Sequence, residues 1–259
     1  MRQVRKLAIL AHPEKPRARK AAEEAAELCR EMDIEAVGNL KAENLDAVLA
    51  FGGDGFFVHT ANGLAEANLQ IPLAGVDFGK MGFLTRIDPL KVGECLEYLR
   101  VGNYFVTERN RLKLECLRNG ELFVVGQALN DVYIERTTVR TITFNVAIGN
   151  QEPFARRADG GLVATKTGST AYNRSLGGPI LTDEKNFVVK IMNSTEIDDK
   201  NTFVISSDQM VQFSDCGGGG IARLVYDGKE LAILDRADVV RIARSELTTR
   251  FIEFSEVDW

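Results

Sequence analysis

Histidine and cysteine are scarce in this chain of 259 residues. The two histidines, His12 and His59, give a histidine-rich metal site or a histidine-based catalytic triad little to draw on. The four cysteines are far apart and form no Cys-x-x-Cys pair, which argues against a disulfide framework and against a zinc site. We therefore predict no resident metal site.

Long apolar runs and an excess of positive charge are also missing. No apolar segment is long enough to span a bilayer, and the first residues lead into a strand-like run without a signal-peptide profile. A formal net charge of −5 argues against a general affinity for nucleic acid or for anionic membranes. With 45% hydrophobic and 27% charged residues, the composition is that of an ordinary globular protein. We expect a cytoplasmic protein that binds neither nucleic acid nor membranes.

The first part of the chain alternates between strand-like and helix-like segments. Short apolar runs predict strands at residues 4–11, 34–37, 48–51 and 71–76. Segments rich in helix-forming residues predict helices at residues 17–32, 56–67 and 90–100. This alternation is typical of an α/β domain with a mainly parallel sheet, which we place at residues 1–104.

After about residue 104 the pattern changes to short alternating or β-branched runs separated by turn signals. The turns include Asn119-Gly120, Gly149-Asn150 and Asp227-Gly228. Their spacing predicts an all-β domain at residues 105–239, with the two layers of a β-sandwich. The fold class is therefore α/β plus all-β.

A glycine-rich turn, Gly52-Gly53-Asp54-Gly55, separates one predicted strand from the next helix. Glycines there let phosphate oxygens approach peptide N–H groups, and the following helix presents its positive end to an anion. A carboxylate would repel phosphate, so Asp54 points to a metal, to an oriented hydroxyl or to proton transfer. Taken alone, the four residues favour a plain glycine turn after a strand over a functional loop.

Two polar clusters interrupt the predicted β-domain. Asn130-Asp131 precedes a strand and has the donors and acceptors to bind a ribose or a base, although it is also a common turn dipeptide. Residues 159–179 hold many small hydroxyls and glycines around Tyr172, a composition that suits a polar, planar ligand. Arg157, just before this segment, is open to phosphate contact or to solvent.

These three stretches, in this order and separation, resemble the three signatures of the NAD kinase family. The turn Asp227-Gly228-Lys229 is similar to a fourth, weaker feature of the family. Diacylglycerol and sphingosine kinases share the glycine-aspartate signature. Residues 167–179 favour the NAD kinases instead.

The resemblance implies an enzyme that transfers a phosphoryl group from ATP with Mg²⁺ to the 2′-hydroxyl of the adenosine ribose of NAD. It implies an α/β domain, a β-domain that binds NAD, and assembly as a homodimer or homotetramer. It also implies that residues 240–259 pack back on the first domain. Phe251, Phe254 and Trp259 are the expected contacts of this return, either there or between subunits.

The resemblance also assigns roles to residues. Asp54 is the catalytic carboxylate beside the acceptor hydroxyl, where it takes the proton and orients the acceptor. The glycine loop holds phosphates, and the second and third signatures hold the dinucleotide. The implied nucleotide-binding residues are Gly52, Gly53, Gly55, Asn130, Asp131, Arg157, Asp159, Thr167, Thr170, Ala171, Tyr172 and Ser175.

The chain differs from the family pattern in several places: residues 193–202 lack the Pro-, His- and Ser-containing pattern of many bacterial members, and Asp131 stands where Glu is commoner. Phe56 stands where a Thr is usual, and Lys166 stands where a Pro is usual. Two alternatives remain beside the kinase: a protein that binds NAD(P) without turnover, and a lipid kinase of the same superfamily. The polar residues 167–175 argue against the lipid kinase, because acyl chains need an apolar pocket.

Overall fold

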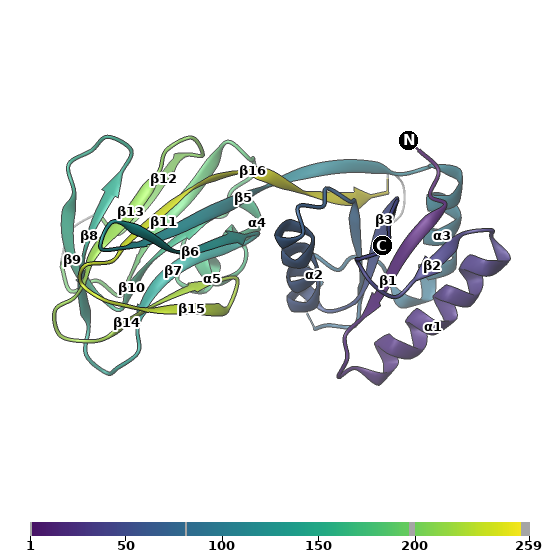
Figure 1. The fold of residues 1–259 in the computed structure, drawn as a ribbon, viewed down its shortest axis with the longest axis horizontal. Coiled ribbons are helices and arrows are strands. Elements are labelled where there is room, and N and C mark those ends of the chain that lie inside the picture. The colour runs from purple at the N-terminus through teal and green to yellow at the C-terminus, as the bar shows by residue number, and fades with distance from the viewer. Residues whose placement is uncertain (1, 81, 197–199, 255–259) are drawn as a thin grey trace. The chain divides into compact units, whose positions relative to one another are not determined.

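A computed structural model describes residues 2–80, 82–196 and 200–254. The chain divides into two compact units, Met1–Glu108 with Thr248–Trp259 (unit 1) and Arg109–Leu247 (unit 2) (Figure 1). The sequence pattern placed the boundaries at 104/105 and 239/240. Strands β5 (Phe105–Arg118) and β16 (Val239–Glu253) run without a break through the observed boundaries, so no turn signal marks them.

Unit 1 is built on a parallel sheet. The strand order is β2 (Glu35–Val37), β1 (Lys6–Ala11), β3 (Ala47–Gly52) and β4 (Leu73–Asp77), followed by the end of β16. The helices are α1 (Pro16–Glu31), α2 (Asp54–Glu66) and α3 (Val92–Val101), with a 3₁₀ turn at Pro89–Lys91. The predicted α/β fold with a parallel sheet is confirmed.

Small residues let α1 lie close to the sheet. Ala18, Ala22, Ala25 and Cys29 recur at helical spacing and are its buried residues. Every residue of β3 is buried, as expected for a strand covered on both faces. Its carboxyl end is therefore held firmly in position.

The chain rejoins unit 1 at Thr248, whereas residues 240–247, which the sequence pattern assigned to this return, belong to unit 2. Phe251 pairs with Leu73 of β4, and its ring meets the Phe57 ring edge-on at 5.0 Å between centroids. Phe254 lies against Tyr98, with 6.1 Å between centroids. Trp259 lies outside the described residues.

Unit 2 is a β-sandwich, as predicted. One sheet has the order β6 (Glu121–Ala128), β5, β16, β13 (Val211–Gly217), β8 (Ile142–Ile148) and β9 (Phe154–Ala158). The other has the order β12 (Thr202–Ser206), β11 (Asn186–Met192), β10 (Gly160–Ala164), β7 (Asp131–Arg136), β14 (Ala222–Tyr226) and β15 (Lys229–Leu234). The core includes Phe144, Phe187 and Phe213.

Residues 159–179 are not one polar loop. Gly160–Ala164 form the fully buried strand β10, between β7 and β11. A Cβ at Gly160 would lie 2.1 Å from the Ile134 carbonyl oxygen, so glycine is required for this close approach of strands. The short helices α4 (Lys166–Ser169) and α5 (Tyr172–Ser175) follow. The described residues contain no helix that is both long and apolar enough to cross a membrane.

Candidate active site

The glycine loop lies where β3 ends and α2 begins, with Gly53 as the residue that precedes the helix. A Cβ at Gly53 would lie 3.1 Å from the Gly79 Cα, and a Cβ at Gly52 would lie 2.7 Å from the Phe56 ring. The Phe78 N–H donates to the Gly52 carbonyl at 2.6 Å. These glycines are therefore needed so that the loop after β4 can pass directly over the loop after β3.

The Asp54 carboxylate accepts four hydrogen bonds from residues 83–85. Oδ1 accepts from the N–H groups of Leu84 and Thr85 and from the Thr85 hydroxyl, each at 3.0 Å. Oδ2 accepts from the Phe83 N–H at 3.0 Å. Since each carboxylate oxygen has about two acceptor positions, Oδ2 retains one for a further donor. The carboxylate is thus fixed in place and still able to accept a hydrogen bond from a hydroxyl.

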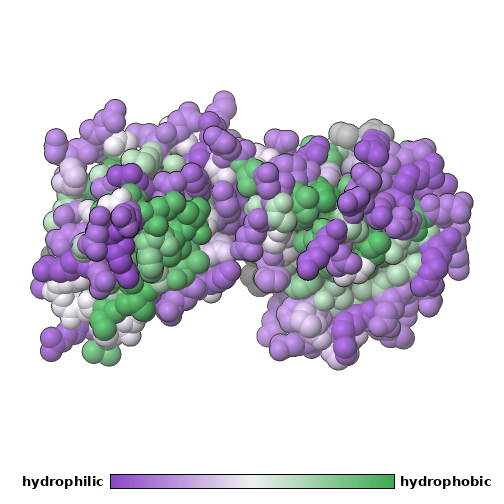
Figure 2. Space-filling model, viewed as in Figure 1, coloured by the Kyte–Doolittle hydropathy of each residue, from purple (hydrophilic) through white to green (hydrophobic). Residues whose placement is uncertain are grey.

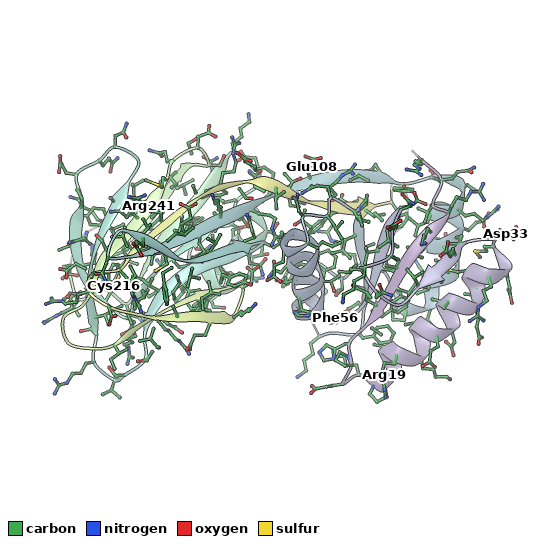
Figure 3. The ribbon with its side chains drawn as sticks, in the orientation of Figure 1. Arg19, Asp33, Phe56, Glu108, Cys216 and Arg241 are labelled. Carbon is green, nitrogen blue, oxygen red and sulfur yellow. The ribbon has the colours of Figure 1, made fainter. Side chains whose placement is uncertain are left out.

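Phe56, labelled in Figure 3, lies in the first turn of α2 between the two histidines of the chain. Its ring centroid is 5.4 Å from that of His12 and 6.4 Å from that of His59. The position where the family usually has a hydroxyl is therefore part of an aromatic cluster. This cluster adds no hydroxyl donor to the glycine loop.

In unit 2, Asn130 and Asp131 are held by a third residue. The Asp227 carboxylate accepts hydrogen bonds from the N–H groups of Leu129 at 2.7 Å, Asn130 at 2.8 Å and Asp131 at 3.1 Å. Asp227 itself has a positive φ of 45° in the turn before Gly228. The weaker family feature thus has a physical role, which is to position the Asn130-Asp131 pair.

Asp131 is buried, and one side-chain atom of Asn130 is both buried and unsatisfied among the described residues. The Asp131 side chain accepts no hydrogen bond from the residues that the structure describes, and the residue is 4% exposed. Burial, and then the charge of Asp227, raises the pKa of Asp131 to about 8. The Asn130 Oδ1 is also buried, without a partner in the described part of the chain. The Asn130 Oδ1 is therefore an acceptor without a donor, and a hydroxyl or an amine of a ligand would satisfy it.

The third signature packs directly on this pair. The Thr165 N–H donates to the Asn130 carbonyl at 2.9 Å, and the Thr165 hydroxyl donates to the Leu129 carbonyl at 2.6 Å. A Cβ at Gly168 would lie 1.9 Å from the Asn130 carbonyl oxygen. The contact between the two signatures thus requires a glycine at position 168.

Tyr172 places an aromatic ring near the Asn130-Asp131 pair. Its ring meets the Tyr133 ring edge-on, with 5.1 Å between centroids. Because side chains alternate along β7, Tyr133 projects from the same face as Asp131. Burial raises the pKa of Tyr172, and the nearby charges of Glu135 and Asp131 add to this. A flat ligand can therefore stack beside the unsatisfied acceptors.

The other predicted residues of unit 2 make contacts of their own. The Thr170 hydroxyl donates to the Thr167 carbonyl at 3.1 Å, and Ala171 precedes α5. Asp159 pairs with Arg136 and accepts a hydrogen bond from Asn193 at 2.9 Å.

A cavity of about 410 Å³ lies beside the end of α5, and Ser175 and Asn193 both line it. Arg157 is exposed, and its N–H donates to the Glu196 carboxylate. No described contact joins the Arg157 side chain to another predicted site residue. Its assignment to phosphate therefore stays a prediction.

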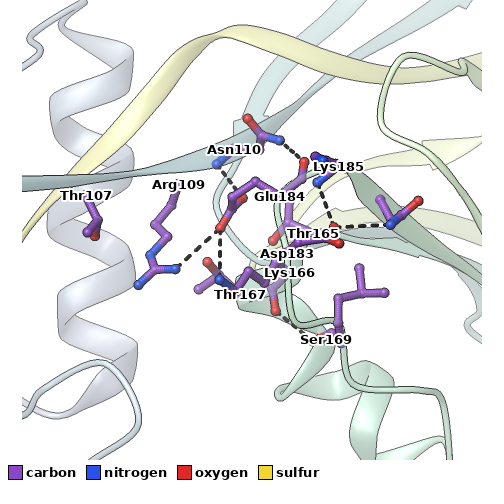
Figure 4. Close-up of polar contacts among 12 residues, drawn as sticks. Thr107, Arg109, Asn110, Thr165, Lys166, Thr167, Ser169, Asp183, Glu184 and Lys185 are labelled. Atoms are coloured by element: carbon purple, nitrogen blue, oxygen red, sulfur yellow. Dashed lines mark hydrogen bonds and ion pairs between the residues drawn. The ribbon is translucent and has the colours of Figure 1, made fainter.

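Lys166 turns toward Glu184 rather than to open solvent (Figure 4). The distance from Nζ to Glu184 Oε1 is 3.9 Å, and the Lys166 side chain is 27% exposed. Glu184 already accepts from the Asn110 N–H at 2.9 Å and pairs with Arg109 at 3.5 Å. The cation that replaces the usual Pro is thus a weak addition to an existing polar cluster.

Sequence reasoning missed several residues of these loops. Thr85 is buried, and its hydroxyl also lies 3.1 Å from Asp77 Oδ1. Lys15 reaches the loop after β4 from the β1–α1 turn. Neither has a local signal beyond its position near a strand end. Among the described residues, no group of three or more His, Cys, Asp or Glu is arranged to hold a metal ion.

Two family models match the two parts of the chain. The model described as the ATP-NAD kinase N-terminal domain matches residues 3–104, and the ATP-NAD kinase C-terminal domain matches residues 129–254. A glycine-loop α/β unit joined to a β-sandwich is therefore the architecture of kinases that act on nucleotides. The chain belongs to the NAD kinase family.

Curated relatives agree with this membership. An NAD kinase of Heliobacterium modesticaldum is 31% identical over 83% of this chain and 76% of its own length. An NAD kinase of Nitrosococcus oceani is 36% identical over 66% of this chain, and the match spans 58% of its length.

Solved structures share the fold. Yeast NADH kinase in complex with NADH has a TM-score of 0.88 at 18% identity, covering 100% of this chain and 86% of that one. An NAD kinase from Archaeoglobus fulgidus in complex with ATP has a TM-score of 0.73 at 22% identity. The match covers 95% of this chain and 92% of that one.

Proposed function

We propose that this protein is an NAD kinase that phosphorylates the 2′-hydroxyl of the adenosine ribose of NAD with Mg-ATP. The observation that carries the proposal is the buried, unsatisfied Oδ1 of Asn130 beside the buried carboxyl group of Asp131. Ribose hydroxyls and the amine of adenine are donors of the kind that this pair lacks. Family membership makes NAD the nucleotide that presents them.

Unit 2 supplies the acceptor site in this proposal. Asn130 and Asp131 bind the adenosine, and Thr167, Thr170, Ala171 and Tyr172 surround the base. Asp159 and Ser175 bind another part of the dinucleotide, and Arg157 approaches a phosphate. The edge-on pair of Tyr133 and Tyr172 supports a stacked base, because a ring held by its neighbour keeps one face in a fixed orientation.

Unit 1 supplies the chemistry. Gly52, Gly53 and Gly55 let backbone N–H groups hold the donor phosphates, and Asp54 orients the acceptor hydroxyl through Oδ2. The ribose oxygen attacks the γ-phosphorus, and the bond from that phosphorus to the β–γ bridging oxygen breaks. ADP leaves, and the hydroxyl proton passes to Asp54 and then to water. Positioning and charge neutralisation supply most of the acceleration in such transfers.

The conditions of the reaction follow from this proposal. Mg²⁺ arrives with ATP as part of the substrate, and the reaction takes place in the cytoplasm, which holds both nucleotides. The protein assembles as a homodimer or homotetramer. Exposed apolar side chains support the assembly: Leu122 is 60% exposed, and Phe123 and Val125 are each 48% exposed on β6. In the view of Figure 2, apolar residues cover part of the visible surface of unit 2.

The test is NADP formation from NAD and Mg-ATP, measured with a NADP-specific dehydrogenase. Asp54→Asn should lose most turnover while NAD affinity stays within several-fold, because the variant removes the carboxylate and keeps the size of the side chain. Asp208→Asn, at an exposed site that pairs with Arg244, is the matched control and should keep full activity.

Two other results would contradict the proposal. NAD binding without turnover in the folded wild type would favour the non-catalytic alternative. Turnover of a diacylglycerol or sphingoid base would favour the lipid kinase.

A further inference from the structure

We propose that Lys15 binds the terminal phosphates of the phosphoryl donor and neutralises the charge that builds up as the donor leaves. This inference rests on the proposed function, because it assigns a residue to the donor side of that reaction. Lys15 lies outside the glycine-aspartate signature and outside the other two.

Lys15 reaches the glycine loop from a different strand end. It follows β1 in the turn before α1, and its N–H donates to the His12 carbonyl at 3.1 Å. Its Nζ donates to the Phe78 carbonyl in the loop after β4, at 2.7 Å. A Cβ built on Gly53 would lie 3.5 Å from this Nζ. The amine is therefore beside the backbone that approaches the phosphates.

Lys15 has no direct ion-pair partner among the described residues. Its side chain is nevertheless partly buried. Lys6 and Lys20 in the same unit do pair, with Glu35 and Glu24. A partly buried ammonium group without a counter-ion loses hydration and gains little in return. An anionic ligand at this place would restore the balance.

The space for such a ligand exists within unit 1. A cavity of about 600 Å³ is lined by two cations, Lys15 and Arg17, and by three carboxylates, those of Glu14, Asp77 and Asp88. An ammonium group has three N–H donors, and the Phe78 carbonyl takes one. Two donors remain for phosphate oxygens. Because three carboxylates also line the cavity, the ligand is best a phosphate chain that brings its own cation, as Mg-ATP or Mg-tripolyphosphate does.

Lys15 then has a defined role in the transfer. As the bond to the β–γ bridging oxygen breaks, negative charge moves onto the leaving diphosphate. A fixed ammonium group beside those oxygens is worth more in this enclosed site than in bulk water. The KM for the donor and kcat should therefore both depend on Lys15, whereas the KM for NAD should not.

The test compares Lys15→Gln with Lys15→Arg and with the control Lys20→Gln, which removes an exposed charge from the same helix. The Gln amide can still donate to the Phe78 carbonyl, so the turn should keep its shape. We expect Lys15→Gln to raise the KM for ATP by about 10- to 100-fold, the range for a lost hydrogen bond to a charged group. The KM for NAD should stay within twofold, and Lys15→Arg should recover most of the ATP affinity. An unchanged KM for ATP, or an equal rise for NAD, would overturn the assignment.

Binding measurements separate this inference from the proposed function. Calorimetric titration of wild type and Lys15→Gln with Mg-ATP, and then with Mg-tripolyphosphate, needs no turnover. Both donors should weaken to a similar extent, because they share the phosphate chain. Loss for ATP alone would place Lys15 at the nucleoside and refute a phosphate contact. Equal affinities of variant and wild type, or no binding of either compound, would refute it as well, whether or not NADP is formed.

Discussion

The buried carboxylate of Asp131 should make the stability of this protein depend on pH in an unusual direction. Burial and Asp227 raise its pKa in the folded state from 3.8 to about 8. Between these two pH values the folded protein holds a proton that the unfolded chain has lost. The contribution of Asp131 to the free energy of unfolding is therefore fully present below about pH 4 and is lost as the pH rises toward 8.

The size of the effect follows from the linkage relation. One bound proton changes the free energy of unfolding by about 1.4 kcal/mol per pH unit. From pH 5 to pH 7 the Asp131 contribution should therefore fall by about 3 kcal/mol. For a chain of this size that corresponds to a decrease of about 5 to 10 °C in the melting temperature.

Asp131→Asn is the variant that isolates this term, because its side chain has nearly the same shape and stays neutral. The assay is thermal unfolding by far-ultraviolet circular dichroism, with wild type and variant measured at pH 5 and pH 7. The wild type should lose about 5 to 10 °C more than Asp131→Asn between the two pH values. Parallel profiles would show that Asp131 is not held neutral by its surroundings. A steeper fall of the melting temperature in Asp131→Asn than in the wild type would contradict the predicted direction of the effect.

Three further substitutions test the site in unit 2. Tyr172→Ala should weaken NAD binding by about tenfold through lost stacking, and unchanged affinity by calorimetry would exclude a base contact. Gly168→Ala should lower the free energy of unfolding by more than about 2 kcal/mol in urea titrations, because its Cβ would overlap the Asn130 carbonyl. A loss below about 0.5 kcal/mol would refute that contact. Lys166→Pro should leave the melting temperature within about 2 °C of the wild type and NADP formation intact. Proline is tolerated there because Lys166 is the first residue of α4 and Thr165 before it has an extended backbone. A large loss of activity would give Lys166 a role in binding.

The sequence predicted the fold class because both halves follow simple periodicities. Buried parallel strands such as β3 read as continuous apolar runs, and the sandwich strands alternate. The strand β10 escaped notice because it opens with Gly160 and Gly161, which resemble a loop. What makes it a strand is the contact with β7 and β11, and no local pattern records that.

The site was predicted less completely. Signatures located Asp54, Asn130 and Asp131, but the side chains that hold them come from distant parts of the chain. Thr85 binds Asp54 from 31 residues away, and Asp227 binds Asp131 from 96 residues away. Such partners depend on the tertiary fold, so a sequence pattern cannot reveal them. The raised pKa of Asp131 likewise appears only when its burial is known.

The division of the chain has a consequence for how the protein is made. Unit 2 is one continuous segment, Arg109–Leu247, inserted within unit 1. The strand that completes the unit 1 sheet, where Phe251 pairs with Leu73, is synthesised after all of unit 2. On the ribosome, the β-sandwich can therefore finish folding while the glycine loop still lies in a sheet that lacks a strand. Phosphate binding would be the last property that the growing chain acquires.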